Sequence, residues 1–234
     1  MPRKIKRRRY DASGRRAAAA STRARILAAA RSLFVARGYL GTKMEDVAAE
    51  AQVALDTVYA SVGTKTKLFH LLVETAISGT DRPVPAEQRS YVQAFKEEPD
   101  AARKLAIYAS AMAKIQARLA PLLVVLRSAA SAHEDLAALW QRISDRRARN
   151  MRKLVAEVVE AGVLRSGIAV EEAADVVWAM ASPDLYLLLV GERAWPAERY
   201  TRWLTDELRR YLLLDDAGEG VNIGGGGRVR PSKS

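Results

Sequence analysis

Residues 23–72 read RARILAAARSLFVARGYLGTKMEDVAAEAQVALDTVYASVGTKTKLFHLL. The apolar residues of the first part share one face at helical spacing: Ile26, Leu27, Ala30, Leu33 and Phe34. Gly38 follows this segment, and glycine readily adopts the left-handed conformation found just after a helix. The stretch therefore opens with an amphipathic helix from Arg23 to about Gly38.

Three more helix starts follow within the same fifty residues. Thr42 and Glu45 have the spacing of a capping box, so a second helix begins just after Thr42. A third helix, from about Leu55 to Ser61, comes after a short connection at residues 52–53. Thr64 is placed to cap a fourth helix. Two helices joined by so short a turn are typical of helix-turn-helix DNA binding.

This arrangement resembles the DNA-binding domain of the tetracycline-repressor (TetR) family over roughly residues 21–80. The matching positions are Arg23, Ile26, Leu27, Gly38, Tyr39, Thr42, Thr57, Val58, Tyr59, Gly63, Thr64 and Lys65. The resemblance implies that the third helix enters the major groove, while Tyr59 and Lys65 hold the phosphate backbone. The DNA-binding residues expected on this basis are Thr42, Leu55, Asp56, Thr57, Tyr59, Ala60, Thr64 and Lys65.

The sequence departs from the family pattern around the turn and the third helix. Gln52 stands where the family usually has glycine, Ala54 where it has a capping serine, and Val62 where it has an aromatic residue. An alanine N-cap costs about 1 kcal/mol relative to serine. The third helix also contains no Arg, Asn or Gln, which are the usual bidentate readers of bases. We therefore expect sequence preference to rest on apolar contacts and DNA shape.

The positive charge of the chain is concentrated at its N-terminus. The net charge is +11, and residues 1–25 contain ten Lys or Arg residues and one acid. We expect residues 1–20 to form a basic arm, disordered when free, that lies along phosphates or in a minor groove. The alternative is a solubilising tail. Residues 215–234 contain three acids, three bases and the run Gly224–Gly227, which predicts a flexible tail.

Helical periodicity continues through the rest of the chain and predicts an all-α protein. The prolines of the segment Thr80–Pro85 indicate a linker between a DNA-binding domain, residues 21–80, and a helical domain, residues 81–214. The segments expected to be helical in the second domain are Leu105–Leu119, Leu122–Leu126, Leu136–Val158, Val170–Ala181, a helix starting at Ser182, and Ala197–Leu214.

The resemblance also implies a C-terminal domain that dimerises through its last helices and holds a pocket for a small effector. We assign dimerisation to segments around Leu185–Val190 and Tyr200–Leu212, with burial inside one chain as the alternative. The residues expected to line a pocket for an apolar effector are Tyr108, Met112, Trp140 and Trp178, with core packing as the alternative.

Several other function classes have little support in the composition. The chain has no cysteine, which excludes disulfides, thiol catalysis and thiolate metal sites. Its two histidines, His70 and His133, have no metal-binding spacing around them. We therefore expect no enzyme activity, cofactor or metal. The longest apolar run, Leu185–Val190, is shorter than a membrane span of about 20 residues, so we expect a cytoplasmic protein without a membrane partner.

These observations favour a TetR-like transcriptional regulator, most often a repressor in that family. It would bind a palindromic operator on double-stranded DNA as a homodimer and respond to a small-molecule effector. The alternative is an architectural DNA-binding protein that tolerates many sequences and depends mainly on the basic arm. Two features favour this alternative: the third helix lacks the usual base-reading residues, and its capping serine is replaced by Ala54.

Overall fold

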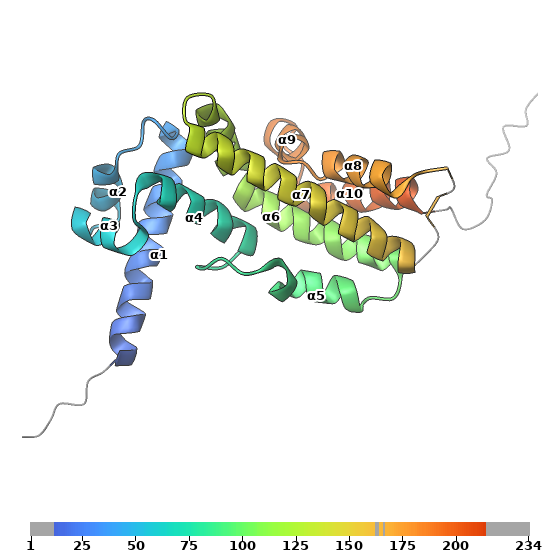
Figure 1. The fold of residues 1–234 in the computed structure, drawn as a ribbon, viewed down its shortest axis with the longest axis horizontal. Coiled ribbons are helices and arrows are strands. Elements are labelled where there is room, and N and C mark those ends of the chain that lie inside the picture. The colour runs from blue at the N-terminus through green and yellow to red at the C-terminus, as the bar shows by residue number, and fades with distance from the viewer. Residues whose placement is uncertain (1–11, 162–163, 166, 214–234) are drawn as a thin grey trace, which may run out of the picture.

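The computed structural model describes residues 12–161, 164–165 and 167–213. These residues form helices, and their one β-interaction is an isolated antiparallel bridge between Leu164 and Leu213. The all-α prediction is confirmed. Four N-terminal helices form a small group beside a longer helical body (Figure 1). The predictions for residues 1–11 and for the tail at 215–234 lie outside the described residues.

The N-terminal group consists of α1 (Ala12–Arg37), α2 (Met44–Glu50), α3 (Leu55–Val62) and α4 (Lys65–Ser78). As predicted, Gly38 follows α1 with a φ of +72°. Thr64 caps α4, because its Oγ1 accepts a hydrogen bond from the Lys67 N–H at 3.3 Å. These local signals therefore set the helix boundaries that the sequence predicts.

The first helix starts much earlier than the apolar periodicity predicts. It begins at Ala12, so residues 12–20, which we expected in a disordered arm, are helical. Residues 14–20 are all exposed, and this part of α1 projects away from the other helices in Figure 1. The run Ala17–Ala20 explains the difference, since alanine has the highest intrinsic helix propensity and needs no apolar face to continue a helix.

The capping box predicted for α2 is wrong. The N-cap of α2 is Lys43, and its N–H donates to Asp46 Oδ2 at 3.2 Å. The Thr42 hydroxyl instead donates to the carbonyl oxygen of Gly38 at 2.9 Å, and Thr42 is only 1% exposed. The reason is that the end of α1 leaves carbonyl groups without helical partners, and Thr42 folds inward to satisfy one of them.

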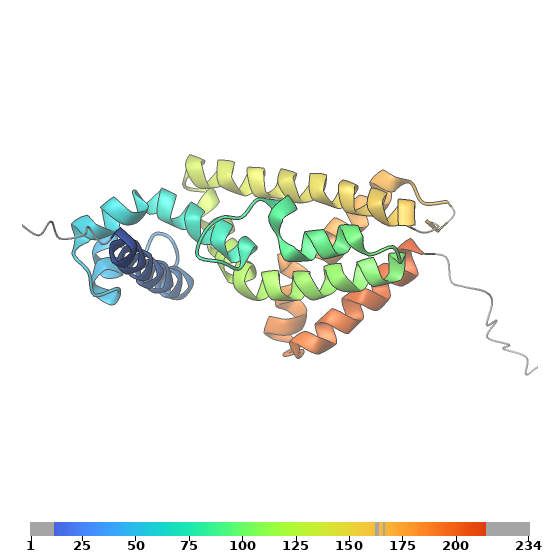
Figure 2. The same cartoon turned by 90° about the horizontal axis from the view of Figure 1, so that it is seen from below.

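The body contains a short 3₁₀ turn (Ala86–Gln88), α5 (Ser90–Glu97), α6 (Ala101–Ala130), α7 (Glu134–Ala161), α8 (Val170–Met180), α9 (Pro183–Tyr186), the π-turn η2 (Leu187–Glu192) and α10 (Ala197–Leu212). In Figure 2, α6 runs through the middle of the body, with α7 on one side and α10 on the other. The 3₁₀ turn and α5 are absent from the sequence prediction. Phe95 is the one buried residue of α5, too little for a periodic pattern.

Helix α6 is continuous where the sequence predicted two helices. Pro121 lies inside it. Proline lacks an N–H and costs about 3 kcal/mol in a helix interior. However, Ala120 and Leu122 on either side of Pro121 are completely buried. Packing of this segment in the core therefore offsets the missing backbone hydrogen bond.

The two segments assigned to dimerisation differ from expectation. Leu185–Val190 is divided between the four-residue α9 and the π-turn η2, rather than lying in one long helix. In the other segment, the main apolar stripe of α10 is fully buried inside the chain: Tyr200, Leu204, Leu208 and Leu212. The intrachain alternative is therefore correct for this stripe.

The apolar core does not stop at the linker between the two predicted domains. One cluster joins Phe34 and Phe69 of the N-terminal group with Leu122 of α6 and Leu139 of α7. Arg118 on α6 adds a polar contact, because its Nε donates to the carbonyl oxygen of Ala76 on α4 at 2.9 Å. The N-terminal helices are therefore packed directly against one end of the body.

Two segments of the described chain are long and apolar enough to span a membrane, although neither is an unbroken run of apolar residues. They are Ala101–Ala130 and Val170–Glu192, each with a mean hydropathy of 1.4. In the first, 61% of the apolar window is buried within the protein, as in a core helix. In the second, only 33% is buried, and Ser182 and Pro183 interrupt the segment. Its exposed large hydrophobic residue is Leu188, which is 47% exposed.

Candidate nucleic-acid interface and ligand cavity

Helix α3 presents one exposed face because its apolar residues are held on the other side. Val58 and Val62 are buried, and Leu55 packs half-buried against the same core. Arg23 on α1 donates from Nη1 to the carbonyl oxygen of Ser61 at 2.8 Å and so fixes the end of α3. The exposed face consists of Asp56, Thr57, Tyr59 and Ala60.

The start of α4 lies immediately after this face in the chain and carries Thr64 and Lys65. The Lys65 Nζ lies 4.3 Å from the centroid of the Tyr39 ring, and burial lowers the pKa of Lys65. Tyr39 is itself fixed, since it is buried and its hydroxyl forms a 3.0 Å hydrogen bond with Thr66 Oγ1. A positioned lysine thus stands at a helix N-terminus, where backbone N–H groups also favour anions.

The expected DNA-binding residues divide into three groups in the structure. Asp56, Thr57, Tyr59 and Ala60 form the outward face of α3, and Thr64 and Lys65 follow at the start of α4. Leu55 is half-buried against the core, so part of its side chain serves packing. Thr42 is buried and its hydroxyl donates to the Gly38 carbonyl oxygen, so the expectation that Thr42 contacts DNA does not fit its position.

The turn between α2 and α3 contains a backbone conformation that glutamine rarely adopts. Gln52 has a φ of +54°, and left-handed backbone costs a residue with a Cβ roughly 1 kcal/mol. We expect Gln52→Gly to raise the free energy of unfolding by about 1 kcal/mol in urea titrations. Gln93→Gly is the matched control, since Gln93 is exposed inside α5 and glycine there should destabilise by about 1 kcal/mol. Equal effects of the two changes would contradict the strain argument.

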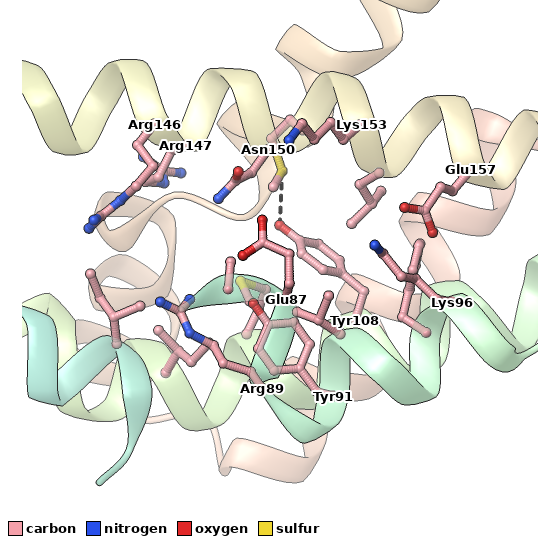
Figure 3. Close-up of a pocket in the computed structure, with 18 of the residues that line it drawn as sticks. Glu87, Arg89, Tyr91, Lys96, Tyr108, Arg146, Arg147, Asn150, Lys153 and Glu157 are labelled. Atoms are coloured by element: carbon pink, nitrogen blue, oxygen red, sulfur yellow. Dashed lines mark hydrogen bonds between the residues drawn. The ribbon is translucent and has the colours of Figure 1, made fainter. Parts of the chain in front are cut away.

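A cavity of about 170 Å³ lies in the body between the 3₁₀ turn, α5, α6 and α7 (Figure 3). Its apolar lining includes Phe95, Met112, Ile115, Leu119, Ile143 and Leu154. Tyr108 also lines the cavity, and its hydroxyl donates to the Met151 sulfur at 3.1 Å. Burial raises the pKa of Tyr108 well above its usual value, so this residue stays a neutral phenol.

Charged side chains surround the apolar lining unevenly. Five are basic, namely Arg89, Lys96, Arg146, Arg147 and Lys153, and two are acidic, namely Glu87 and Glu157. Figure 3 shows Arg146 and Arg147 at one end of the cavity, with Lys96 and Glu157 at the other. The end with the two arginines therefore has the greater positive charge.

The four residues expected to line a ligand pocket lie in two neighbouring cavities. Tyr108 and Met112 line the first cavity. Trp140 and Trp178 line a second one of about 180 Å³. Arg147 lines both cavities, and its guanidinium lies 4.8 Å from the centroid of the Trp178 ring.

Two polar residues that line the first cavity were not among the lining residues predicted from the sequence. Arg147 lies in the charged run Asp145–Arg149, which by itself looks like a solvated helix face. Gln116 lies in the buried register of α6 and is 2% exposed. A glutamine within an apolar helical stripe is the signal that would have identified it.

One end of the first cavity is connected directly to the N-terminal helices. Arg146, which lines the cavity, forms a bidentate pair with Glu74 on α4, with nitrogen–oxygen distances of 2.9 and 3.2 Å. The Glu74 side chain is only 17% exposed, so water screens this pair less than it would screen a surface pair. A ligand bound near Arg146 would therefore contact a residue that is ion-paired with α4.

Comparison with known proteins gives concordant results for the two parts of the chain. Residues 26–72 match the family model of bacterial regulatory proteins of the tetR family. No curated protein matches the chain. Among the described residues, no group of three His, Asp or Glu residues is arranged to hold a metal ion.

Solved structures match over most of the chain. The regulator FadR from Bacillus subtilis in complex with stearoyl-CoA has a TM-score of 0.63 and 17% identity, covering 79% of this chain and 96% of FadR. The TetR family regulator PfmR from Thermus thermophilus has a TM-score of 0.60 and 22% identity, covering 79% and 97%. A Saccharomonospora viridis protein described as a transcriptional regulator, in complex with choline, has a TM-score of 0.62 and 16% identity, covering 82% and 97%. Residues 26–72 thus match the tetR-family model, and the chain has the fold seen in solved TetR-family transcriptional regulators.

Proposed function

We propose that this protein is a cytoplasmic DNA-binding repressor that recognises a palindromic operator as a homodimer and responds to a small organic effector. The observation that carries the proposal is the tetR-family match at residues 26–72, together with the exposed face of α3. In this proposal Asp56, Thr57 and Ala60 face the major groove. Tyr59, Thr64 and Lys65 contact the adjacent phosphates.

The proposed homodimer is supported by the apolar surface that a single chain leaves uncovered. Leu188 on η2 is 47% exposed, within the apolar segment Val170–Glu192. One recognition helix reads only a half-site, whereas two helices held about 34 Å apart read a palindrome. An interface at η2 would bury this side chain and supply the second helix.

Leu188→Asp is expected to dissociate the dimer, because the interface would then have to bury an unpaired carboxylate. Light scattering behind a sizing column should show the wild type as a dimer and Leu188→Asp as a monomer. Val124→Asp is a matched control, since Val124 is also 45% exposed but lies on α6. Identical masses for all three proteins would refute this interface.

The effector role is supported by the cavity and by ligand complexes of similar folds. FadR was solved with stearoyl-CoA and the Saccharomonospora viridis protein with choline, ligands of very different size and charge. In our proposal a ligand in the cavity favours one spacing of the two recognition helices. Its effect is limited by the difference between its affinities for the two conformations.

Selection of the purified protein against a random duplex pool, at near-physiological salt, tests DNA recognition. A palindrome with half-sites about one helical turn apart is the expected result. Retention without sequence enrichment would support the architectural alternative, for which the lack of Arg, Asn and Gln in α3 is the favouring observation. Absence of retention would overturn both functions.

Lys65→Ala is expected to weaken binding to all duplexes alike, because a phosphate contact carries no sequence information. The slope of log affinity against log salt should fall by about 0.9, the value for one phosphate that is no longer neutralised. Fluorescence anisotropy over a salt series measures both quantities. Lys114→Ala, which changes an exposed lysine on α6, should leave affinity and slope unchanged. A weakening confined to one base position would contradict the phosphate assignment for Lys65.

A further inference from the structure

Arg147 introduces a positive charge into the cavity wall, and among the described residues no carboxylate forms a close ion pair with it. Its Nη2 donates to the carbonyl oxygens of Trp178 at 2.9 Å and Ala181 at 3.4 Å. Among the described residues, no carboxylate forms an ion pair with Arg147 within 4 Å. Asp184 acts on Arg147 from a greater distance and is itself paired with Arg127 at 2.7 Å. Burial lowers the pKa of the Arg147 guanidinium, yet arginine remains charged in proteins. A partly buried cation of this kind favours an anionic partner.

Gln116 places an unpaired acceptor beside this cation. Its Nε2 donates to the carbonyl oxygen of Ala181 at 2.8 Å, the same oxygen that Arg147 approaches. Its Oε1 is buried and has no hydrogen-bond partner among the described residues. Buried polar atoms are normally paired, so a ligand that donates a hydrogen bond to this oxygen would be stabilised. Both Gln116 and Arg147 line the cavity, so a ligand there can reach the two together.

The remainder of the cavity limits the size and polarity of the ligand. Its volume of about 170 Å³ is close to that of an apolar cavity of about 150 Å³ that admits benzene. Met112, Ile115 and Leu119 offer apolar contacts along α6. The ligand body should therefore be apolar and about as large as one aromatic ring or a short alkyl chain.

The two acids of the lining do not neutralise this end of the cavity. Glu157 follows Arg147 on α7 by about 15 Å along the helix axis, and Figure 3 shows it near Lys96. Glu87 lies on the 3₁₀ turn, and Figure 3 shows its carboxylate near Asn150, between the two ends of the cavity. It forms no ion pair with Arg147 among the described residues. Arg146 is paired with Glu74, and Arg89 donates to the carbonyl oxygen of Val84. Arg147 is the cation of this end that lies beside Gln116, since both approach the Ala181 carbonyl.

We propose that the cavity binds a small 2-hydroxy acid with an apolar substituent. Its carboxylate would accept from Arg147, its hydroxyl would donate to Gln116 Oε1, and its substituent would lie against the apolar residues of α6. Arg147 and Gln116 approach the same carbonyl oxygen, so a ligand with its carboxylate and hydroxyl on neighbouring carbon atoms can reach both. This inference rests on the effector role proposed above and gives that effector its chemical class.

Two sets of three compounds test the assignment by isothermal titration calorimetry on the full chain. Mandelate is compared with phenylacetate, which lacks the hydroxyl, and with 1-phenyl-1,2-ethanediol, which lacks the charge. The aliphatic set is 2-hydroxyoctanoate, octanoate and octane-1,2-diol. In at least one set, the hydroxy acid should bind roughly tenfold or more tightly than both of its analogues. Equal binding of the acid without the hydroxyl would overturn the role of Gln116, and equal binding of the diol would overturn that of Arg147.

Arg147→Gln and Lys153→Gln provide a matched pair of variants, because each removes one positive charge from the α7 lining of the cavity. Arg147→Gln should weaken binding of the hydroxy acid by roughly tenfold to a hundredfold, whereas Lys153→Gln should change its affinity by less than about twofold. Glutamine retains donors for the carbonyl groups of Trp178 and Ala181, and thermal melting verifies folding. Equal weakening in both variants would indicate general attraction of anions and overturn the assignment.

Failure of this inference can be told apart from failure of the proposed function. Selection of a palindrome by a protein that binds none of the six compounds would leave the regulator proposal intact and overturn the 2-hydroxy acid assignment. Specific binding of a hydroxy acid by a protein that selects no DNA would support the 2-hydroxy acid assignment and overturn the proposed DNA recognition.

Discussion

Removal of residues 1–11 is expected to lower affinity for every duplex, most strongly at low salt, while leaving the preferred palindrome unchanged. The deleted segment contains six basic residues: Arg3, Lys4, Lys6, Arg7, Arg8 and Arg9. If each contacts one phosphate, the salt slope should fall by about five units. A slope difference of five means that the affinity ratio of the full-length protein to the shortened protein is roughly a thousandfold larger at about 50 mM salt than at about 200 mM salt.

The same deletion distinguishes a specific regulator from an architectural DNA-binding protein. Affinities measured by anisotropy for the selected palindrome and for a scrambled duplex should fall by the same factor, so their ratio is retained. Replacing only Arg7, Arg8 and Arg9 by alanine should produce about half of the change in slope. Complete loss of DNA binding at all salt concentrations, with no remaining preference, would instead support the architectural alternative.

Glu74→Gln is expected to abolish most of the effect of an effector on operator affinity. Glu74 on α4 pairs with Arg146 of the cavity, so it provides the polar link between ligand and DNA-binding helices. Couplings of this kind typically change affinity by about 5-fold to 150-fold. We expect that factor to approach one in the variant, measured as operator affinity with and without a saturating effector.

Arg210→Gln is the control for this experiment, since it removes another ion pair, with Glu207, that lies within α10. It should leave the effector response intact. Calorimetry must show that Glu74→Gln still binds the ligand, because the prediction concerns transmission and not ligand binding. An unchanged response in Glu74→Gln would mean that coupling passes through the shared apolar core rather than through this ion pair.

The helices of the DNA-binding region could be predicted because their signals are local. Gly38 after α1 and Thr64 before α4 act on backbone groups within a few residues. The same local reasoning failed for Thr42, whose hydroxyl had a competing acceptor at the end of the preceding helix. It also failed at Pro121, where burial of the neighbouring residues outweighs the proline penalty.

The sequence by itself determined the all-α class, the helix-turn-helix and the residues on the outward face of α3, because helical periodicity and caps depend on neighbours along the chain. The polar end of the cavity was decided only by tertiary structure. Gln116, Arg147 and Ala181 come from three separate parts of the chain and meet at one carbonyl oxygen. The pairing of Arg146 with Glu74 spans 72 residues. Such contacts depend on how helices pack against one another, and no local pattern specifies that packing.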